Sequence, residues 1–266
     1  MEELSSQVDM LKKGGITPGL ALVLTGSDKN SSRYVKLKKK RAEKIGIYTE
    51  LHKLEETTQD NLIRLIIDLN EDPKIHGIMI QLPLADGLNE LAAVNAIQPE
   101  KDVDGLSPNT LGKILMGEEA YMPAGVDAIL ELLDRYNIDI QGRHWVVIGS
   151  SNFLSKPLVA ALANKNVRVS LCREDDIEYS RLVNNADVLS TEIFKKHAIT
   201  SNMVKKGVIV IDNGNNYEGK KVYGDIDYEE VLKKASAITP VPGGVGPMLI
   251  AMLLKNTIIA AEKSSV

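Results

Sequence analysis

An aromatic ring and an amine, Tyr34 and Lys38, lie four positions apart in the phrase Ser-Ser-Arg-Tyr-Val-Lys-Leu-Lys at 31–38. On an α-helix this spacing places both side chains on one face, where they can contact each other and a flat heterocyclic ligand. Four further basic residues surround Lys38: Lys36, Lys39, Lys40 and Arg41. Because such a run is also typical of a solvated helix face, the spacing alone leaves both interpretations open.

Gln81 begins the phrase Gln-Leu-Pro-Leu at 81–84, at the C-terminal end of an expected strand over 77–82. Ligands collect at this end of strands in open α/β sheets, and the glutamine amide can accept a hydrogen bond from Lys38. A carboxylate in its place would keep the lysine charged. A glutamine that only closes a strand before Pro83 fits the phrase equally well.

Two carboxylates, Asp102 and Asp104, flank Val103 in the phrase Pro-Glu-Lys-Asp-Val-Asp-Gly at 99–105. Aspartates in such turns often accept hydrogen bonds from nearby backbone amides. Residues two apart lie on opposite sides of an extended chain, so a pair sharing one proton is not expected.

Two glycine-containing phrases could bring the backbone close to a ligand. Gly149, Ser150 and Ser151 follow an expected strand and precede an expected helix, which is where a dinucleotide pyrophosphate binds free amides, although the G-x-G-x-x-G pattern is missing. The phrase Pro-Val-Pro-Gly-Gly-Val-Gly-Pro at 240–247 permits close approach because glycine lacks a Cβ, or forms a tight loop before a final helix.

Taken together, the phrases at 31–38, 81–84, 99–105 and 240–247 resemble the bifunctional methylenetetrahydrofolate dehydrogenase/methenyltetrahydrofolate cyclohydrolase family, from about Gly19 to the C-terminal helix. The resemblance implies these catalytic residues: Lys38, Tyr34 and Gln81. It implies these substrate-binding residues: Tyr34, Leu82, Asp104, Pro242, Gly243 and Gly246. In this family Asp104 would accept hydrogen bonds from the pterin, and Asp102 is expected to be structural.

The resemblance implies NADP as the cofactor, held by these residues: Gly149, Ser150, Ser151, Arg173 and Asn215. Arg173 could bind a 2′-phosphate, whereas Glu174 and Asp175 would repel one. An acidic residue after the second strand of such a domain favours a free ribose hydroxyl, so NAD stays possible.

The chain departs from the family pattern near the expected cofactor cleft. Serines replace an arginine and a glycine at Ser150 and Ser155, and Thr-Glu-Ile-Phe at 191–194 replaces an Ala-x-Gly-x-Pro phrase. Further departures are Met-Pro-Ala-Gly at 122–125, Asn215 and Leu249. These positions bear on the dehydrogenase and its cofactor more than on folate binding.

The implied reactions are oxidation of 5,10-methylenetetrahydrofolate to the 5,10-methenyl compound and its hydrolysis to 10-formyltetrahydrofolate. Oxidation needs positioning, because the two nitrogens stabilise the cation left when hydride departs. Hydrolysis needs proton transfers that a neutral amine can perform. We expect partial burial and nearby cations such as Arg41 to lower the pKa of Lys38.

Apolar strands at 19–24, 77–82, 144–149, 167–172, 186–190 and 207–212 alternate with expected helices at 32–45, 58–70, 125–136 and from 247 to about 261. This alternation predicts an α/β fold with mostly parallel sheets. We expect a catalytic domain at 1–120, completed by 247–266, and a Rossmann-type dinucleotide-binding domain at 121–246. The resemblance implies a cleft between them.

The composition narrows the class of protein. A net charge of -4 and a pI near 5.7 argue against a broad nucleic-acid footprint, and no stretch of about 20 consecutive apolar residues predicts a membrane span. One cysteine and four scattered histidines give no disulfide and no metal site, and the acidic start fits a cytoplasmic protein. The resemblance implies a homodimer.

Two other functions are compatible with parts of this sequence. Another two-domain nicotinamide dehydrogenase, of the shikimate or amino-acid type, would share the architecture, but the combination of Tyr34, Lys38, Gln81 and Asp104 argues against it. A nucleic-acid-binding module using the basic run 36–41 predicts steep salt dependence and conflicts with the acidic balance.

Overall fold

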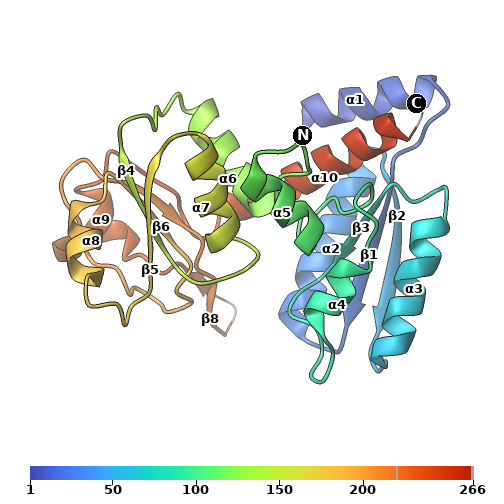
Figure 1. The fold of residues 1–266 in the computed structure, drawn as a ribbon, viewed down its shortest axis with the longest axis horizontal. Helices are drawn as coiled ribbons and strands as arrows, with labels where there is room; N and C mark the ends of the chain where they lie inside the picture. Colours follow the sequence, from blue (N-terminus) through green and yellow to red (C-terminus); the bar gives the residue numbers. More distant parts are fainter. Residues whose placement is uncertain (220, 265–266) are drawn as a thin grey trace. The chain divides into compact units, whose positions relative to one another are not determined.

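The computed structural model describes residues 1–219 and 221–264 (Figure 1). The chain divides into two compact units. Unit 1 comprises Met1–Lys113, Glu119–Ala124 and the segment from Ile250 onward, and unit 2 comprises Ile114–Glu118 and Gly125–Leu249. Each unit contains a parallel sheet, so the two-domain α/β architecture predicted from the sequence is confirmed.

Unit 1 is built on three parallel strands in the order β2-β1-β3. Its strands are β1 (Gly19–Thr25), β2 (Tyr48–Leu54) and β3 (Gly77–Ile80). Its helices are α1 (Glu2–Lys13), α2 (Lys29–Lys44), α3 (Gln59–Glu71) and α4 (Glu90–Asn95), and α5 (Pro108–Met116) begins in this unit. All seven residues of the central strand β1 are buried, and α3 and α4 pack on one face of the sheet.

Local capping sets the helix bounds in unit 1. The Asp28 carboxylate accepts a hydrogen bond from the Ser31 amide (2.6 Å), so α2 begins three residues earlier than predicted, and Gly46, with φ +88°, follows its end. The Thr58 hydroxyl accepts a hydrogen bond from the Asn61 amide (3.3 Å), which confirms the predicted cap of α3.

Unit 2 is built on five parallel strands in the order β10-β7-β6-β4-β5. These are β4 (His144–Ile148), β5 (Arg168–Cys172), β6 (Val188–Thr191), β7 (Ile209–Asp212) and β10 (Ala237–Ile238), with a separate antiparallel pair, β8 (Asn216–Glu218) and β9 (Lys221–Tyr223). The helices are α6 (Ala124–Arg135), α7 (Ser155–Asn164), α8 (Tyr179–Asn185), the 3₁₀ helix η1 (Ser201–Met203) and α9 (Tyr228–Leu232). The crossover after β4 is therefore β4-α7-β5, as in dinucleotide-binding folds.

The last helix, α10 (Val245–Lys263), corrects the expectation that no segment is apolar enough to span a membrane. Its 19 residues and mean hydropathy of 1.4 meet that test by length and composition. The test is also met by core helices, and 56% of the apolar window is buried inside the protein. The Asn256 amide donates to the Val103 carbonyl (2.9 Å) and the Met122 carbonyl (3.2 Å), which ties α10 into unit 1.

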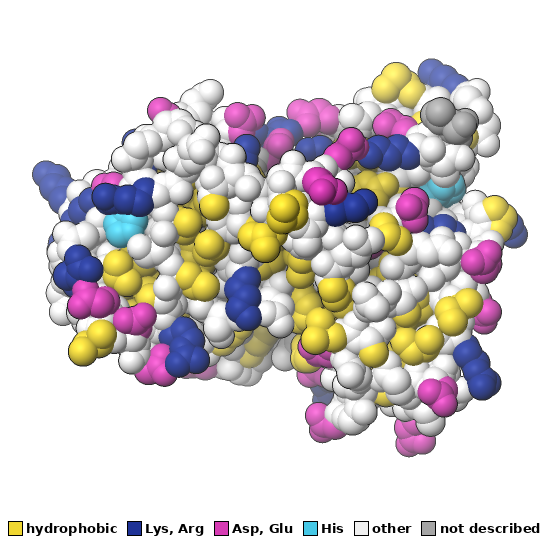
Figure 2. Space-filling model, viewed as in Figure 1, with side chains coloured by type: hydrophobic (Ala, Val, Ile, Leu, Met, Phe, Trp, Pro, Cys, Tyr) yellow, Lys and Arg dark blue, Asp and Glu magenta, His cyan; other side chains and the backbone are white. Residues whose placement is uncertain are grey.

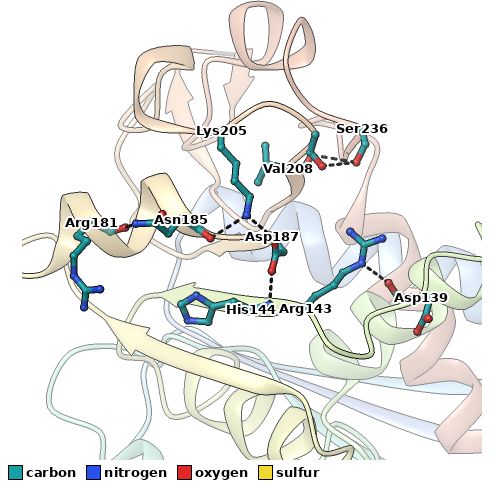
Figure 3. A network of polar contacts seen from close by, with 10 residues as sticks. Asp139, Arg143, His144, Arg181, Asn185, Asp187, Lys205, Val208 and Ser236 are labelled. Atoms are coloured by element: carbon teal, nitrogen blue, oxygen red, sulfur yellow. Dashed lines mark hydrogen bonds and ion pairs between the residues drawn. The ribbon is translucent and has the colours of Figure 1, made fainter.

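A polar network joins the N-terminal ends of strands in unit 2 (Figure 3). The Asp187 carboxylate, just before β6, accepts hydrogen bonds from the His144 amide (2.6 Å) and the Lys205 ammonium. The Ser236 hydroxyl donates to the Gly207 carbonyl (2.8 Å) beside it. Because ligands of such sheets bind at the opposite, C-terminal ends of the strands, this network is structural.

Asp187→Ala should therefore destabilise unit 2 without altering ligand binding. The hydrogen bonds from His144 and Lys205 hold the pKa of Asp187 below its ordinary value, so their stabilisation is present above pH 3.8 and is lost as the pH falls through the lower folded value. Allowing for partial solvent screening, we expect a loss of about 1–3 kcal/mol at pH 7. Urea unfolding measures it, with the exposed Asp134→Ala as control; equal midpoints for both variants would contradict the structural role.

Candidate functional site

Lys38 is buried although it belongs to a basic run. Its side chain is 7% exposed, whereas Lys36 and Lys40 on the same helix are exposed. Ser31, Val35, Lys38 and Ala42 share the buried face of α2, in the helical period that directs them to the core. The solvated-face interpretation is therefore wrong for Lys38, and only this lysine of the run is available for chemistry in a dry environment.

The Lys38 ammonium meets the C-terminal end of β3. Its Nζ atom donates to Gln81 Oε1 (3.1 Å) and lies 3.7 Å from Met79 Sδ. The Gln81 backbone amide donates to the Val23 carbonyl (2.8 Å), and Gln81 Nε2 donates to the Leu82 carbonyl (2.7 Å). Since the amide nitrogen is already engaged, the oxygen of Gln81 is directed at Lys38.

Burial is the main cause of the electrostatics at Lys38. It lowers the pKa of the lysine, and the carboxylate of Asp104 opposes this shift. Burial likewise raises the pKa of Asp104, opposed by Lys38 and reinforced by Asp102. The expectation that neighbouring cations such as Arg41 lower the pKa of Lys38 is wrong, because the charged group that acts on the amine is an anion from another part of the fold.

The two aspartates of the 99–105 turn have different surroundings. Asp102 is 1% exposed, and its carboxylate accepts hydrogen bonds from the Leu106 amide (3.1 Å), the Ser107 amide (2.9 Å) and the Thr110 hydroxyl (2.7 Å). It therefore fixes the turn and the start of α5. Asp104 keeps part of its surface exposed, although the surrounding protein removes enough water from its carboxylate to raise its pKa, and that carboxylate accepts no hydrogen bond from the residues that the structure describes. Asp104 is thus the aspartate with acceptor capacity for a ligand.

Unit 1 brings together Lys38, Gln81 and Asp104 from a helix, a strand end and a turn. Tyr34 lies one turn before Lys38 on α2 and is partly exposed, and Leu82 follows Gln81 and is also partly exposed. The sequence did not single out Met79, whose sulfur contacts the lysine. The arrangement combines a buried amine, a neutral hydrogen-bond acceptor and a carboxylate, which is suited to proton transfer on a bound heterocycle.

In unit 2 the predicted pyrophosphate turn follows β4. Gly149 has φ +153°, and a Cβ at this position would lie 2.2 Å from Ser155 Oγ, so only glycine fits. The Ser151 hydroxyl accepts hydrogen bonds from the amides of Phe153 (2.9 Å) and Leu154 (3.1 Å) and so shapes the turn into α7.

A pocket of about 270 Å³ opens at the C-terminal ends of β4 and β5. It is lined by Gly149, Ser150, Lys156, Leu171, Cys172, Arg173, Asp175 and Asp176. The guanidinium of Arg173 is paired with the Asp175 carboxylate through Nε (3.0 Å) and Nη2 (2.6 Å). The pocket lies at the sheet edge where dinucleotide-binding folds hold their cofactor, and Arg173, the predicted ligand of a 2′-phosphate, is paired there with a carboxylate.

The remaining predicted residues of unit 2 lie outside this pocket lining. Asn215 is exposed between β7 and β8, and the buried side-chain oxygen of Asn213 has no hydrogen-bond partner among the described residues. Pro242 and Gly243, with φ +124°, lie in the loop before α10, whereas Gly246 belongs to the first turn of α10, which begins two residues earlier than predicted. A Cβ on Gly246 would meet no atom within 4 Å, so a ligand could approach there.

Two family models match successive parts of the chain, and the second extends over α10, whose residues from Ile250 onward belong to unit 1 in the structure. Residues 1–104 match the catalytic domain of tetrahydrofolate dehydrogenase/cyclohydrolase, and residues 123–265 match its NAD(P)-binding domain. The chain belongs to this family.

Among residues 1–219 and 221–264, no group of three or more His, Cys, Asp or Glu side chains could hold a metal ion.

Relatives match over nearly the whole length. The chain is 43% identical to the bifunctional protein FolD of Methanococcoides burtonii, over 99% of this chain and 93% of that protein, and 42% identical to that of Bacillus subtilis, over 99% and 94%. A crystal structure of the bifunctional enzyme from Campylobacter jejuni superposes with a TM-score of 0.96 at 41% identity, covering 99% of this chain and 94% of that one.

Two further structures bear on the cofactor and on the alternative function. The Trypanosoma brucei dehydrogenase-cyclohydrolase, solved with NADP and an inhibitor, has a TM-score of 0.95 at 32% identity and covers 99% of this chain and 94% of that one. A shikimate 5-dehydrogenase from Thermus thermophilus has a TM-score of 0.56 at 13% identity, covering 92% of this chain and 99% of that one. The latter shares the fold alone, so the shikimate-type alternative is not supported.

Proposed function

We propose that this protein oxidises 5,10-methylenetetrahydrofolate to 5,10-methenyltetrahydrofolate with NADP and hydrolyses the product to 10-formyltetrahydrofolate in one-carbon metabolism. The observation that carries the proposal is the buried Lys38, bonded to Gln81 and acted on by the carboxylate of Asp104, in a chain that matches both family domains. Unit 1 is the folate-binding catalytic domain and unit 2 the dinucleotide-binding domain.

In the hydrolysis, Lys38 moves the protons. As a neutral amine it takes one proton from the water that adds to the methenyl carbon, and it then returns that proton to N5 as the bond between N5 and that carbon breaks. The second proton of the added water leaves to solvent as its oxygen becomes the formyl carbonyl. Burial lowers the pKa of Lys38, which increases the neutral fraction at physiological pH. Gln81 holds the amine in place with a neutral oxygen and so does not stabilise its charged form.

The substrate is held by groups around this amine. Asp104 accepts hydrogen bonds from the pterin amino and ring NH groups, and Tyr34 lies against the flat ring system. Leu82 supplies an apolar contact. Pro242, Gly243 and Gly246 are the further substrate-binding residues that the family resemblance implies.

The cofactor, when bound, accepts the hydride of the oxidation step. The residues that would hold it are Gly149, Ser150, Ser151, Arg173 and Asn215. The pocket beside Gly149 and the NADP in the related Trypanosoma brucei structure support NADP. The pairing of Arg173 with Asp175 favours NAD, so the two cofactors should be compared directly.

A spectrophotometric assay tests the proposal. Purified protein is given 5,10-methylenetetrahydrofolate with NADP⁺ or NAD⁺ in parallel, and the methenyl compound is supplied separately to follow its hydrolysis. Reduction with NADP⁺ together with hydrolysis is the expected result. Hydrolysis without reduction of either cofactor would contradict the proposed dehydrogenase activity and leave the cyclohydrolase activity. No turnover in any assay would refute both activities.

The protein is further proposed to be a cytoplasmic homodimer that binds tetrahydrofolate derivatives, with no nucleic-acid or membrane partner. The assembly and location rest on the family resemblance, and the single cysteine, Cys172, is buried, as suits a reducing compartment. On the face shown in Figure 2, basic and acidic side chains are interspersed, which does not favour nucleic acid. Light scattering after gel filtration measures the assembly.

A further inference from the structure

Glu192 lies directly beside the pyrophosphate turn of unit 2. It follows β6, and its amide donates to the Ile148 carbonyl (2.8 Å) at the end of β4. A Cβ built on Gly149 would lie 3.2 Å from the Cβ of Glu192. The parallel ladder between β4 and β6 therefore delivers this side chain to the C-terminal edge of the sheet, next to the glycine that lines the pocket.

The carboxylate of Glu192 is bonded to the start of α7. Its Oε2 atom accepts a hydrogen bond from the Ser155 hydroxyl, and the nearby Ser151 hydroxyl and Ser155 amide also act to lower the pKa of the carboxyl group. Burial raises the pKa of Glu192, which these hydrogen bonds oppose. The carboxyl group is thus held at the N-terminal end of α7, beside the turn that follows β4.

The backbone around Glu192 is anchored as well. The buried carboxylate of Asp225 accepts hydrogen bonds from the amides of Ile193 (2.7 Å) and Lys195 (3.0 Å). The loop after β6 is therefore fixed to the body of unit 2, and Glu192 can leave the turn only by rotating its own side chain.

This arrangement conflicts with a bound dinucleotide. The amides and dipole at the start of a helix after the first strand are the groups that stabilise a pyrophosphate, and here a carboxylate uses part of that capacity. Two anions at one helix terminus repel each other, and displacing Glu192 breaks its hydrogen bonds. Both the repulsion between the two groups and the loss of the hydrogen bonds of Glu192 would reduce the free energy gained from cofactor binding.

We propose that Glu192 controls the affinity of the dinucleotide site: its carboxylate competes with the cofactor pyrophosphate and weakens binding of NADP and NAD alike. The inference rests on the proposed function, since it takes the ligand of unit 2 to be a dinucleotide. Half-occupancy by the cofactor would then require a higher dinucleotide concentration than in a site whose helix terminus is open.

Glu192→Gln tests the proposal because glutamine keeps the size of the side chain and a partner for the Ser155 hydroxyl but removes the charge. The dissociation constants of NADP⁺, NAD⁺ and adenosine 2′-monophosphate are measured by calorimetry, without substrate. We expect both dinucleotides to bind about tenfold more tightly and the monophosphate, which lacks a pyrophosphate, to be unchanged. The matched control is Glu178→Gln, which removes an exposed carboxylate from the same unit.

Equal dinucleotide affinities in native protein and Glu192→Gln would overturn the proposal, as would weaker binding, a matching gain in Glu178→Gln, or no measurable dinucleotide binding in any of them. Glu192→Ala, compared by near-ultraviolet circular dichroism and melting temperature, shows whether a loss reflects misfolding. Hydrolysis of methenyltetrahydrofolate needs no dinucleotide, so its retention while the affinities stay equal would refute the role of Glu192 and leave the proposed cyclohydrolase standing.

Discussion

Lys38→Met is expected to reduce hydrolysis of 5,10-methenyltetrahydrofolate by about 10³-fold while the protein still binds folate and dinucleotide. Proton transfer by a positioned side chain contributes about 10²–10⁴-fold, and methionine cannot take the proton of the attacking water. The rate is measured by loss of methenyl absorbance under saturating substrate. Unaltered turnover would remove Lys38 from the mechanism.

Two matched variants show whether Lys38 acts as a base or only as a positive charge. Lys38→Arg keeps a cation near Asp104 but has a pKa too high to become neutral, so it should be as inactive as the methionine variant. Lys36→Met removes an exposed lysine two positions away and should retain full activity. Substantial hydrolysis by the arginine variant would show that the positive charge, not the proton transfer, is what the site requires.

The pH dependence of hydrolysis follows from the same amine. Burial lowers the pKa of Lys38 from 10.5, so the neutral, active form should accumulate as the pH rises through that lower value. The rate should therefore increase with pH and level off below pH 10.5. Its inflection, measured on the native protein and absent from Lys38→Arg, reports this group.

Asp104→Ala should weaken folate affinity by about 10²-fold and leave dinucleotide affinity unchanged. Removing a carboxylate that accepts hydrogen bonds from a ligand leaves the ligand donors unpaired, at a cost of about 1.5–3 kcal/mol for each charged hydrogen bond. Titration with a non-reacting folate analogue and with NADP⁺ measures the two affinities. Equal losses for both ligands would indicate misfolding rather than a lost contact.

Asp102→Ala is the matched control, because it changes the same residue type two positions away. Asp102 is fully buried and fixes the turn through Leu106, Ser107 and Thr110, so this variant should lower the free energy of unfolding more than it lowers the affinity for folate.

The variant Asp104→Asn tests the electrostatic coupling between Asp104 and Lys38. Because the Asp104 carboxylate raises the pKa of Lys38 against burial, its neutralisation should move the inflection of hydrolysis to lower pH. An inflection at the native pH would contradict the coupling.

Elements with a strong local signal were predicted from the sequence. The apolar run of β1, the cap of α3 at Thr58 and the strands β4, β5, β6 and β7 of unit 2 each follow from residues within one segment, whereas the two-residue strand β10 was missed. Elements without such a signal were missed. Strand β2 lies at the edge of its sheet and has mostly half-buried polar residues, so it contains no apolar run from which it could be predicted. Its extended conformation is stabilised by pairing with β1.

The sequence by itself determined which residues could do chemistry. These are the tyrosine and lysine one helical turn apart, the neutral glutamine after a strand, the two aspartates of the 99–105 turn and the glycine after β4. Only the tertiary structure decided which lysine of a basic run is buried, that Asp104 rather than Arg41 acts on its pKa, and that Asp175 holds Arg173. It also decided that Glu192 lies against the pyrophosphate turn. The physical reason is that the burial and the pKa of a side chain depend on its neighbours in space. The neighbours of Lys38 at the end of β3 lie more than 40 positions from it in the sequence.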